Sequence, residues 1–421
     1  GNLDGISQIF GGVWDQYISG ISWQGFDYWQ SSRMMPPDPP GFEVTEFPFF
    51  TFLFADLHSH LISIPFTLLL LATMLSLVIS PTSRRGGIQM SFHELATIFT
   101  MGIVLGSVRI INAWDFPTYF FLGCFSLLLR EVFAHGGIGV IVGARWLFKA
   151  AIFYFVSYMA FIPFYSNYKN FYSSVEATTN KTELNQMLMI FGIFIFIIIG
   201  YLVINARRTF AFSNIKPISL SIPKAIYIVI ASMVIGYLVS GPLEKIIGGA
   251  ALLLIPIIGL LCYSLVTGVS RFKNKERYTV FAMLLLSMSL AIIVGVEFVR
   301  IQGDIDRMNT VFKFYLQAWI LLGIGCSFLF WRCIQEIKEN GKTRVNIFLF
   351  GTCCILIGFG LIYPIFGTPA RIGDRFTTTK QTLDGTAYMN KSLYRDPQGE
   401  IDLSFDYKAI DWLNNNLTGV P

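Results

Sequence analysis

Three stretches of the sequence place acidic, basic and imidazole side chains directly beside long apolar runs. They read EFPFFTFLFADLHSH from Glu46 to His60, RIINAWDFPTY from Arg109 to Tyr119, and EFVRIQGDIDRMNTVFKFY from Glu297 to Tyr315. Their polar members are Glu46, Asp56, His58, His60, Arg109, Asn112, Trp114, Asp115, Glu297, Arg300, Asp304, Asp306, Arg307, Asn309 and Lys313. Carboxylates and imidazoles in this density indicate acid–base chemistry, metal binding, or both.

The spacing D-x-H-x-H joins Asp56, His58 and His60. On an extended segment all three side chains point the same way, whereas on a helix only Asp56 and His60 share a face. Either arrangement could hold a divalent cation such as Mg²⁺ or Mn²⁺, or set Asp56 as a general base beside a histidine. The alternative is that the histidines only cap a helix or form hydrogen bonds at the membrane interface.

Glu297 and Arg109 fall within or at the ends of apolar runs. An ionised side chain there costs about 2.5–3.5 kcal/mol on insertion scales unless it is paired or faces a wet cavity, so such residues usually line a cavity. The alternative for Glu297 is a local pair with Arg300, one helical turn away, that reaches the interface.

Helix ends suggest what the basic residues bind. Apolar runs beginning near Ser63, Asp115 and Asn309 are expected to start on the same side of the membrane. Helix N-termini carry free N–H groups and partial positive charge, which suit an anion. With Arg300, Arg307 and Lys313 close by, the pattern favours a phosphate or pyrophosphate ligand.

The amino-acid composition indicates the kind of structure that positions these residues. Of 421 residues, 54% are hydrophobic and only 14% are charged, whereas soluble domains carry roughly 25% charged residues. This low fraction of charged residues indicates that much of the chain is surrounded by a lipid bilayer. The six cysteines lie in or beside apolar runs without a CxxC spacing, so we expect small core residues. No nucleotide-loop, dinucleotide, serine-hydrolase or zincin motif occurs, and no interleaved basic patch predicts nucleic-acid binding.

Ten apolar runs are long enough to cross a hydrocarbon layer, which needs about 20 residues. They are 61–80, 92–112, 115–133, 146–164, 187–205, 225–241, 246–267, 278–298, 310–331 and 345–363. We therefore predict an all-α polytopic membrane protein of about ten transmembrane helices.

The charges of the connecting loops predict the orientation. Connections on one side carry Arg84, Arg85, Arg130, Arg145, Arg207, Arg208, Lys216, Lys224, Arg271, Lys273, Lys275, Arg277, Arg332, Lys338, Lys342 and Arg344. Connections on the other side carry only Lys169, Lys181, Lys245, Arg300 and Arg307. By the positive-inside rule the first side is cytoplasmic, so the site and both ends of the chain are expected outside the cytoplasmic membrane.

The predicted organisation has three parts. Residues 1–60 form an outer loop on the membrane face, 61–363 the transmembrane helical domain, and 364–421 the start of a small soluble segment. The chain begins without Met and stops within what reads as a polar domain, so we interpret it as a fragment.

Several blocks, in order along the chain, resemble the YYY membrane protein family, an uncharacterised group of Chloroflexi and archaea. They are GNLDG, FDYWQSSRMMP, TEFPFFTFLFADLHSHLISIPF, NAWDFPTY, DRMNTVFKFYLQAW and TLDGTAYM. The tri-tyrosine block that names the family is absent; the family would place it before Gly1. The architecture of the family is similar to that of GT-C membrane glycosyltransferases, which take a sugar from a polyprenyl-phosphate donor at the outer face.

The resemblance implies a glycosyltransferase-like enzyme whose partners are a lipid-linked sugar and membrane lipids. Asp56 would be base or metal ligand, assisted by His58 and His60, and Glu297 would take part in catalysis or bind metal or acceptor. Metal ligands would be Asp56, His60, Asp304 and Asp306, and substrate would contact Arg109, Asp115, Arg300, Arg307, Asn309 and Lys313. Two alternatives stay open: a transporter or channel, which would carry charges near the membrane midplane, and an assembly scaffold without chemistry.

Overall fold

The computed structural model describes residues 3–20, 25–35, 44–81, 90–168, 174–210, 248–270, 276–304, 307–340, 344–375, 382–396 and 399–419. Some sequence predictions lie outside these residues: the span at 225–241, the candidate ligand Asp306, and the loop charges Arg84, Arg85, Lys169, Lys216, Lys224, Lys245, Arg271, Lys273, Lys275 and Lys342.

Within the described residues, nine stretches of helix are long and apolar enough to cross a membrane. They are α3 (Ser59–Ile79), α4 (Phe92–Ile111), α5 (Asp115–His135), α6 (Val140–Met159), α8 (Leu184–Phe210), α11 (Gly249–Ser270), α12 (Glu276–Val296), α13 (Met308–Asn340) and the pair α14 (Arg344–Gly360) with α15 (Ile362–Arg375). The prediction of a polytopic helical membrane protein is confirmed. The fourth predicted span was misplaced: α6 begins several residues before the predicted 146, and Pro163 lies in the first turn of the separate short helix α7 (Ile162–Tyr165).

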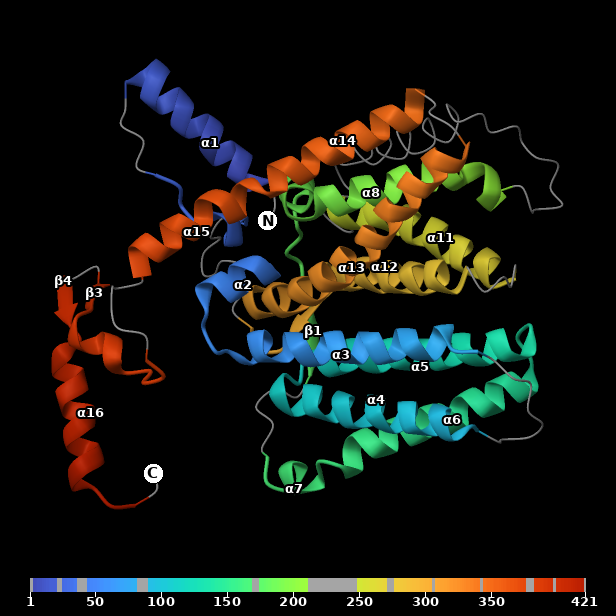
Figure 1. Ribbon diagram of the computed structural model, residues 1–421, viewed down its shortest axis with the longest axis horizontal. Coiled ribbons are helices and arrows are strands. Elements are labelled where there is room, and N and C mark those ends of the chain that lie inside the picture. Colours follow the sequence, from blue (N-terminus) through green and yellow to red (C-terminus); the bar gives the residue numbers. More distant parts are fainter. Residues whose placement is uncertain are drawn as a thin grey trace.

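The helices lie side by side in two groups joined by α12 and α13 (Figure 1). One core combines α3, α4 and α5 with Phe153 of α6, and the other is built mainly from α8, α11, α12 and α13. Both cores are almost wholly aliphatic and aromatic, so the helices meet through close packing of apolar side chains.

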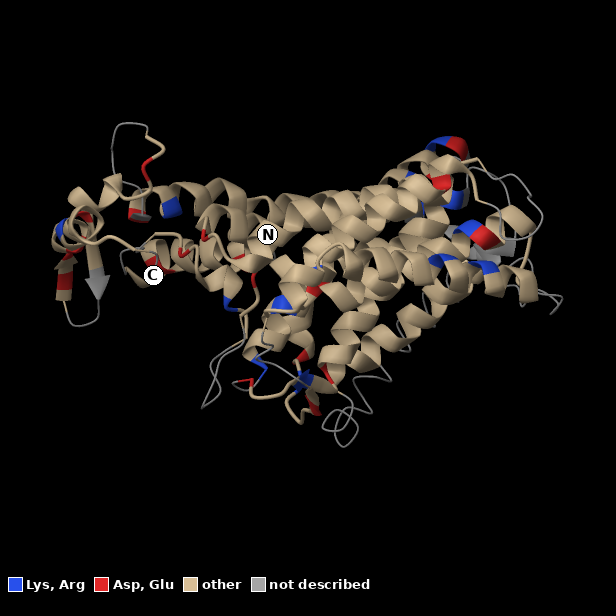
Figure 2. Ribbon diagram, turned by 90° about the horizontal axis from the view of Figure 1, so that it is seen from below, with Lys and Arg blue, Asp and Glu red and all other residues tan. Residues whose placement is uncertain are grey.

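We name each end of the helical bundle after a carboxylate that is buried there. The Asp115 end holds the first residues of α3, α5 and α13 and the last residues of α4, α6 and α12; the Glu131 end holds the opposite termini. Charged residues gather toward the ends of the helices (Figure 2). Between the ends lie fully buried apolar side chains such as Leu70, Leu105 and Leu122.

Helices α4 and α6 approach each other most closely at two glycines, Gly102 and Gly106. A Cβ on Gly106 would stand 2.4 Å from the ring of Phe161 and 2.5 Å from the backbone oxygen of Ser157. A Cβ on Gly102 would stand 2.7 Å from Val156. The spacing GxxxG is the small-residue pattern that lets membrane helices pack backbone to backbone. This contact fixes the separation of α4 and α6 at the Asp115 end.

The N-terminal segment, predicted to be a loop, contains helices. These are α1 (Asp4–Trp14), the π-helix η1 (Asp15–Ser19), the 3-10 helix η2 (Gln30–Ser32) and α2 (Pro48–Phe54). Tyr28, Phe47 and Phe50 pack with Tyr363 of α15 in a separate aromatic core. That core ties the N-terminal segment to the bundle.

Two small antiparallel sheets complete the described structure. Strand β1 (Val175–Ala177) pairs with β2 (Val299–Ile301), so Glu176 lies opposite Arg300. Strands β3 (Leu393–Asp396) and β4 (Gly399–Asp402) form a hairpin between the 3-10 helix η3 (Ala387–Asn390) and α16 (Ser404–Asn416).

Candidate functional site

A cavity of about 430 Å³ opens at the Asp115 end. It is lined by Ser59, Arg109, Ile110, Ile111, Asn112, Ala113, Trp114, Tyr158, Phe164, Tyr165, Tyr168 and Lys313. These residues come from the starts of α3 and α13, the turn between α4 and α5, and the end of α6 with α7. The cavity therefore combines cationic and aromatic side chains, and its volume falls within the usual range for small-molecule sites.

Arg109 is held between two aromatic rings on one wall of this cavity. Its guanidinium carbon lies 4.5 Å from the ring centroid of Tyr165 and 4.8 Å from that of Phe116. Tyr165 in turn stacks on Tyr158 with centroids 5.1 Å apart. Burial raises the pKa of the Tyr165 phenol despite the opposing charge of Arg109, so the phenol is neutral at physiological pH. The rings fix the direction of the guanidinium, whose planar shape suits phosphate.

Lys313 separates the cavity from a smaller enclosed chamber of about 10 Å³. The chamber is lined by His60, Ile64, Thr67, Asn112, Asp115, Tyr119, Lys313, Leu316, Gln317 and Ile320. Asp115 is 5% exposed, accepts a hydrogen bond from the Ser63 hydroxyl, and lies within electrostatic reach of Lys313 and His60. The chamber thus places a buried carboxylate directly behind one of the two cations.

Asp56 and His58 form an exposed pair beside this region. Helix α2 ends at Ala55, whose φ of 59° makes it the one non-glycine residue with positive φ in the described chain. After this turn Asp56 Oδ2 lies 2.6 Å from His58 Nδ1, with 45% and 63% of the two side chains exposed. A carboxylate on Nδ1 fixes the tautomer and leaves Nε2 to act as base or ligand.

The His60 side chain faces Glu46, so the three side chains of the D-x-H-x-H sequence do not meet at one point. The His60 side chain is 9% exposed, with Nε2 3.5 Å from Glu46 Oε2 and its ring edge-to-face with Phe312. Glu46 also accepts a hydrogen bond from Thr51 at 3.1 Å. The rings of His58 and His60 are 5.7 Å apart.

Glu297 and Arg307 are brought together, but inside the protein. Glu297 is fully buried; it accepts hydrogen bonds from Arg307 at 3.2 Å and from the backbone N–H of Thr182 at 2.8 Å. Lys181 donates to the backbone oxygen of Glu297, and burial lowers the Lys181 pKa. The contacts join the start of α8 to the ends of α12 and α13. The alternative pairing of Glu297 with Arg300 is wrong.

Asp304, Asn309 and Arg300 have local partners. Asp304 caps α13, accepting hydrogen bonds from the backbone N–H of Thr310 at 2.8 Å and that of Asn309 at 3.1 Å. Arg300 donates to Glu176 at 2.8 Å across the β1–β2 pair. These residues shape the Asp115 end, whereas Arg109, Asp115 and Lys313 line its cavities.

The candidate metal-ligating side chains that the structure describes do not form a site for a divalent metal. Asp56 bonds His58, His60 faces Glu46, and Asp304 caps a helix. Among the described residues no three His, Cys, Asp or Glu side chains are grouped as ligands. Because Asp306 lies outside these residues, a Mg²⁺ or Mn²⁺ site stays a prediction.

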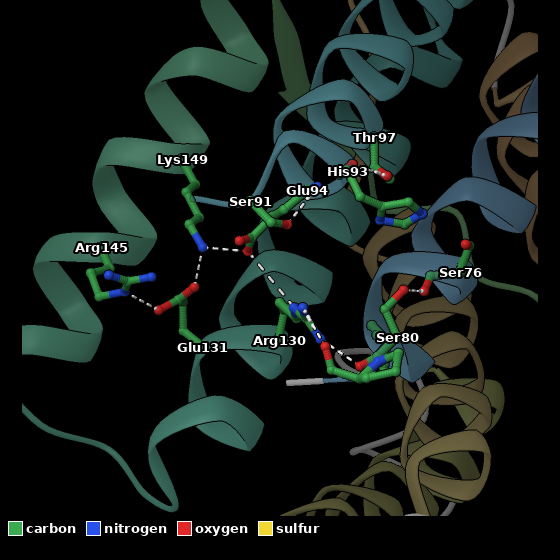
Figure 3. Close-up of polar contacts among 12 residues, drawn as sticks. Ser76, Ser80, Ser91, His93, Glu94, Thr97, Arg130, Glu131, Arg145 and Lys149 are labelled. Atoms are coloured by element: carbon green, nitrogen blue, oxygen red, sulfur yellow. Dashed lines mark hydrogen bonds and ion pairs between the residues drawn. The ribbon is translucent and has the colours of Figure 1, made fainter. Parts of the chain in front are cut away.

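A buried charge network at the Glu131 end was not predicted from the sequence (Figure 3). Lys149 of α6 bridges Glu94 of α4 and Glu131 of α5, and Arg145 donates to Glu131 at 2.6 Å. Arg130 and Arg145 were interpreted only as loop charges that set the orientation. The available signal was the presence of Arg130, Glu131 and Lys149 inside predicted spans, which marks a paired or functional group.

The same end also holds the last turn of α3. Arg130 donates to the backbone oxygen of Ser80 at 2.5 Å, and Arg277 of α12 donates to that oxygen at 2.7 Å. Cations at a helix C-terminus oppose its partial negative charge. The network therefore fixes α3, α4, α5, α6 and α12 relative to one another.

The apolar helices, the buried charges at their ends and the cavity between helix termini define a polytopic α-helical membrane protein. A family model described as "Uncharacterized membrane protein (DUF2298)" matches residues 1–322. The chain belongs to this family. No curated protein and no solved structure matches the chain.

Proposed function

We propose that the chain is a membrane-embedded glycosyltransferase that moves a sugar from a polyprenyl phosphate to an acceptor at the outer face of the cytoplasmic membrane. One observation carries the proposal: a cavity of about 430 Å³ that offers Arg109, Lys313 and an aromatic wall, beside the exposed Asp56–His58 pair. The similarity in architecture to GT-C glycosyltransferases supports the same reaction.

Arg109 and Lys313 bind the phosphate of the donor. Two cations that line the same cavity neutralise a phosphate as its bond to the sugar breaks, which is the usual means of stabilising such a leaving group. Trp114 and Tyr168 provide flat surfaces for the sugar ring. Exposed apolar residues of α6, Phe155 among them, lead away from the cavity and suit an isoprenoid tail.

His58 acts as the base, held by Asp56. As the acceptor hydroxyl oxygen bonds to the anomeric carbon, its proton passes to His58 Nε2 and the bond to the phosphate oxygen breaks, releasing polyprenyl phosphate. Asp56 stabilises the imidazolium through Nδ1–H, as in other carboxylate–histidine pairs. The geometry therefore favours His58 as the base. The sequence had instead assigned this role to Asp56. Glu297, Arg300, Arg307 and Asn309, which were also predicted to contact substrate, support the site from within the fold.

The test is transfer by the purified full-length protein, incubated with labelled polyprenyl-phosphate sugars with and without Mg²⁺ or Mn²⁺. We expect His58→Gln and Asp56→Asn to lose transfer at least a hundredfold, the typical contribution of a positioned base. His93→Gln, an exposed histidine at the Glu131 end, and Asp411→Asn, on α16, are matched controls. Full activity in folded His58→Gln protein would contradict the assignment of the base.

A transporter is the second candidate, because the Glu94–Lys149–Glu131 network places ionised groups within the spans. Transport needs a polar route between the two ends. Leu70, Leu105 and Leu122 lie between the ends and are fully buried, which favours the enzyme. Uptake of labelled lipid-linked sugar into proteoliposomes, without transfer, would favour transport.

A further inference from the structure

Lys313 is shared by two spaces of different character. On one side it lines the large cavity, together with Arg109. On the other it lines the enclosed chamber that contains Asp115. Lys313 therefore lies between the open cavity and the chamber that holds the Asp115 carboxylate.

Lys313 is one of the groups that stabilise the ionised carboxylate of Asp115, after the hydrogen bonds from Ser63 and Asn112. The carboxylate is 5% exposed, and its neutral partners are the Ser63 hydroxyl and Asn112. A buried carboxylate stays ionised only while hydrogen bonds and nearby positive charge together compensate for its lost hydration. An anion that binds Lys313 from the cavity weakens that compensation, so the free energy of the ionised carboxylate rises.

We propose that binding of an anionic headgroup in the cavity is coupled to the uptake of one proton by Asp115. The coupling rests on the proposed function, since it requires an anion at Lys313. The proton comes from solvent and ends on the Asp115 carboxylate; no other bond changes. The pair of anion and protonated Asp115 then carries the same net charge as the empty site with ionised Asp115.

The chamber has room for one water molecule beside Asp115. Its volume is about that of one water, and Asp115, Asn112 and Gln317 supply polar atoms to its lining. Gln317 donates its amide N–H to the backbone oxygen of Trp114 at 3.1 Å, while its side-chain oxygen is buried without a hydrogen-bond partner. One water would satisfy this oxygen and connect the chamber lining to Asp115.

Other titratable groups face Asp115 from each neighbouring element. His60 faces it from α3, Lys313 from α13, and Tyr119 from the next turn of α5. Asp304 also lies within electrostatic reach of Lys313, but its oxygens are occupied as the cap of α13. His60 also lines the chamber, and Glu46 lies on its far side.

The test uses isothermal titration calorimetry of the detergent-solubilised protein with a farnesyl-phosphate sugar. This probe is a phosphodiester that does not itself titrate near neutral pH. Titrations in buffers of different ionisation enthalpy give the number of protons taken up. We expect about one proton in the wild type, with affinity increasing up to tenfold for each unit of falling pH in the range where Asp115 is ionised in the free protein.

Variants separate the coupling from binding itself. Asp115→Asn and Lys313→Met should each bind the probe without proton uptake, Lys313→Met more weakly; His60→Gln should keep the uptake. Binding without uptake in the wild type, or unchanged uptake in folded Asp115→Asn, overturns the coupling alone. If His60→Gln loses proton uptake while Asp115→Asn keeps it, the proton binds His60, and the proposed coupling to Asp115 is overturned. If the probe does not bind, the proposed function fails, and the coupling with it.

Discussion

At the residue scale, Arg109 shows how the fold prepares a cation for an anion. Its guanidinium lies between the rings of Tyr165 and Phe116, at 4.5 and 4.8 Å from their centroids. The rings restrict its rotamers before any ligand binds, so less conformational entropy is lost on binding. Lysine would keep the charge but not the planar stacking.

We therefore predict that Arg109→Lys weakens binding of a farnesyl-phosphate sugar about tenfold. The lost ring contacts and bidentate geometry correspond to roughly 1–2 kcal/mol. Calorimetric affinity measures this directly. Arg332→Lys, on the part of α13 far from the cavity, is the matched control and should bind as the wild type does. Equal affinities for both variants would exclude Arg109 as a headgroup ligand.

Lys149 is the most informative single residue of the Glu131 end. Its ammonium contacts Glu94 and Glu131, and its side chain and that of Glu131 are each 1% exposed. Replacing Lys149 with Met removes one of the cations that compensate the charges of Glu94 and Glu131. Removing one partner of a buried ion pair costs about 3–5 kcal/mol.

We expect Lys149→Met to lower the thermal unfolding temperature in detergent by several degrees. Adding Glu94→Gln should recover part of the loss, because it removes one of the uncompensated charges. Lys408→Met, on the exposed face of α16, should leave the transition unchanged. A wild-type transition for Lys149→Met would mean that the network contributes no stability.

At the element scale, the sequence predicted the helices better than their contacts. Hydropathy and length define a membrane span locally, so the described spans were found with small errors such as the start of α6. The partner of Glu297 was not predictable in this way. Thr182 and Arg307 reach it from the starts of α8 and α13, and only packing brings these elements together. The different surroundings of His58 and His60 depend likewise on where α3 begins, because His58 is its extended N-cap and His60 lies in its first turn.

The contact of α4 with α6 gives an element-scale prediction. Gly106→Leu places a side chain where a Cβ alone would lie 2.4 Å from Phe161, so the helices must separate. Overpacking costs typically 1–3 kcal/mol, and here it also displaces Arg109 from Tyr165. We expect a lower unfolding temperature together with weaker binding of the farnesyl-phosphate sugar.

Gly143→Leu is the matched control, because nothing lies within 4 Å of a Cβ at Gly143 of α6. It should leave stability and binding unchanged. If Gly106→Leu also binds the probe normally, the α4–α6 contact does not set the shape of the cavity.

At the scale of the whole molecule, the two ends differ in how they use charge. The Glu131 end buries acids and bases in mutual contact, as Figure 3 shows. The Asp115 end also buries an ion pair, Glu297 with Arg307, but in addition it lines an open cavity with Arg109 and Lys313. An apolar layer separates the two ends. This asymmetry suits a chain with one working face, and the distribution of loop charges predicts that this face is outside.

Labelling of introduced cysteines tests that orientation. His58 and His93 are exposed and lie at opposite ends of the bundle, so His58→Cys and His93→Cys form a matched pair. In intact cells a membrane-impermeant maleimide should label the variant at 58, while the variant at 93 should react only after the cells are permeabilised. The unsubstituted chain corrects for its native cysteines, of which Cys262 and Cys354 are exposed on spanning helices. The reverse pattern would place the cavity in the cytoplasm, where a donor at the outer face could not reach Arg109 or Lys313.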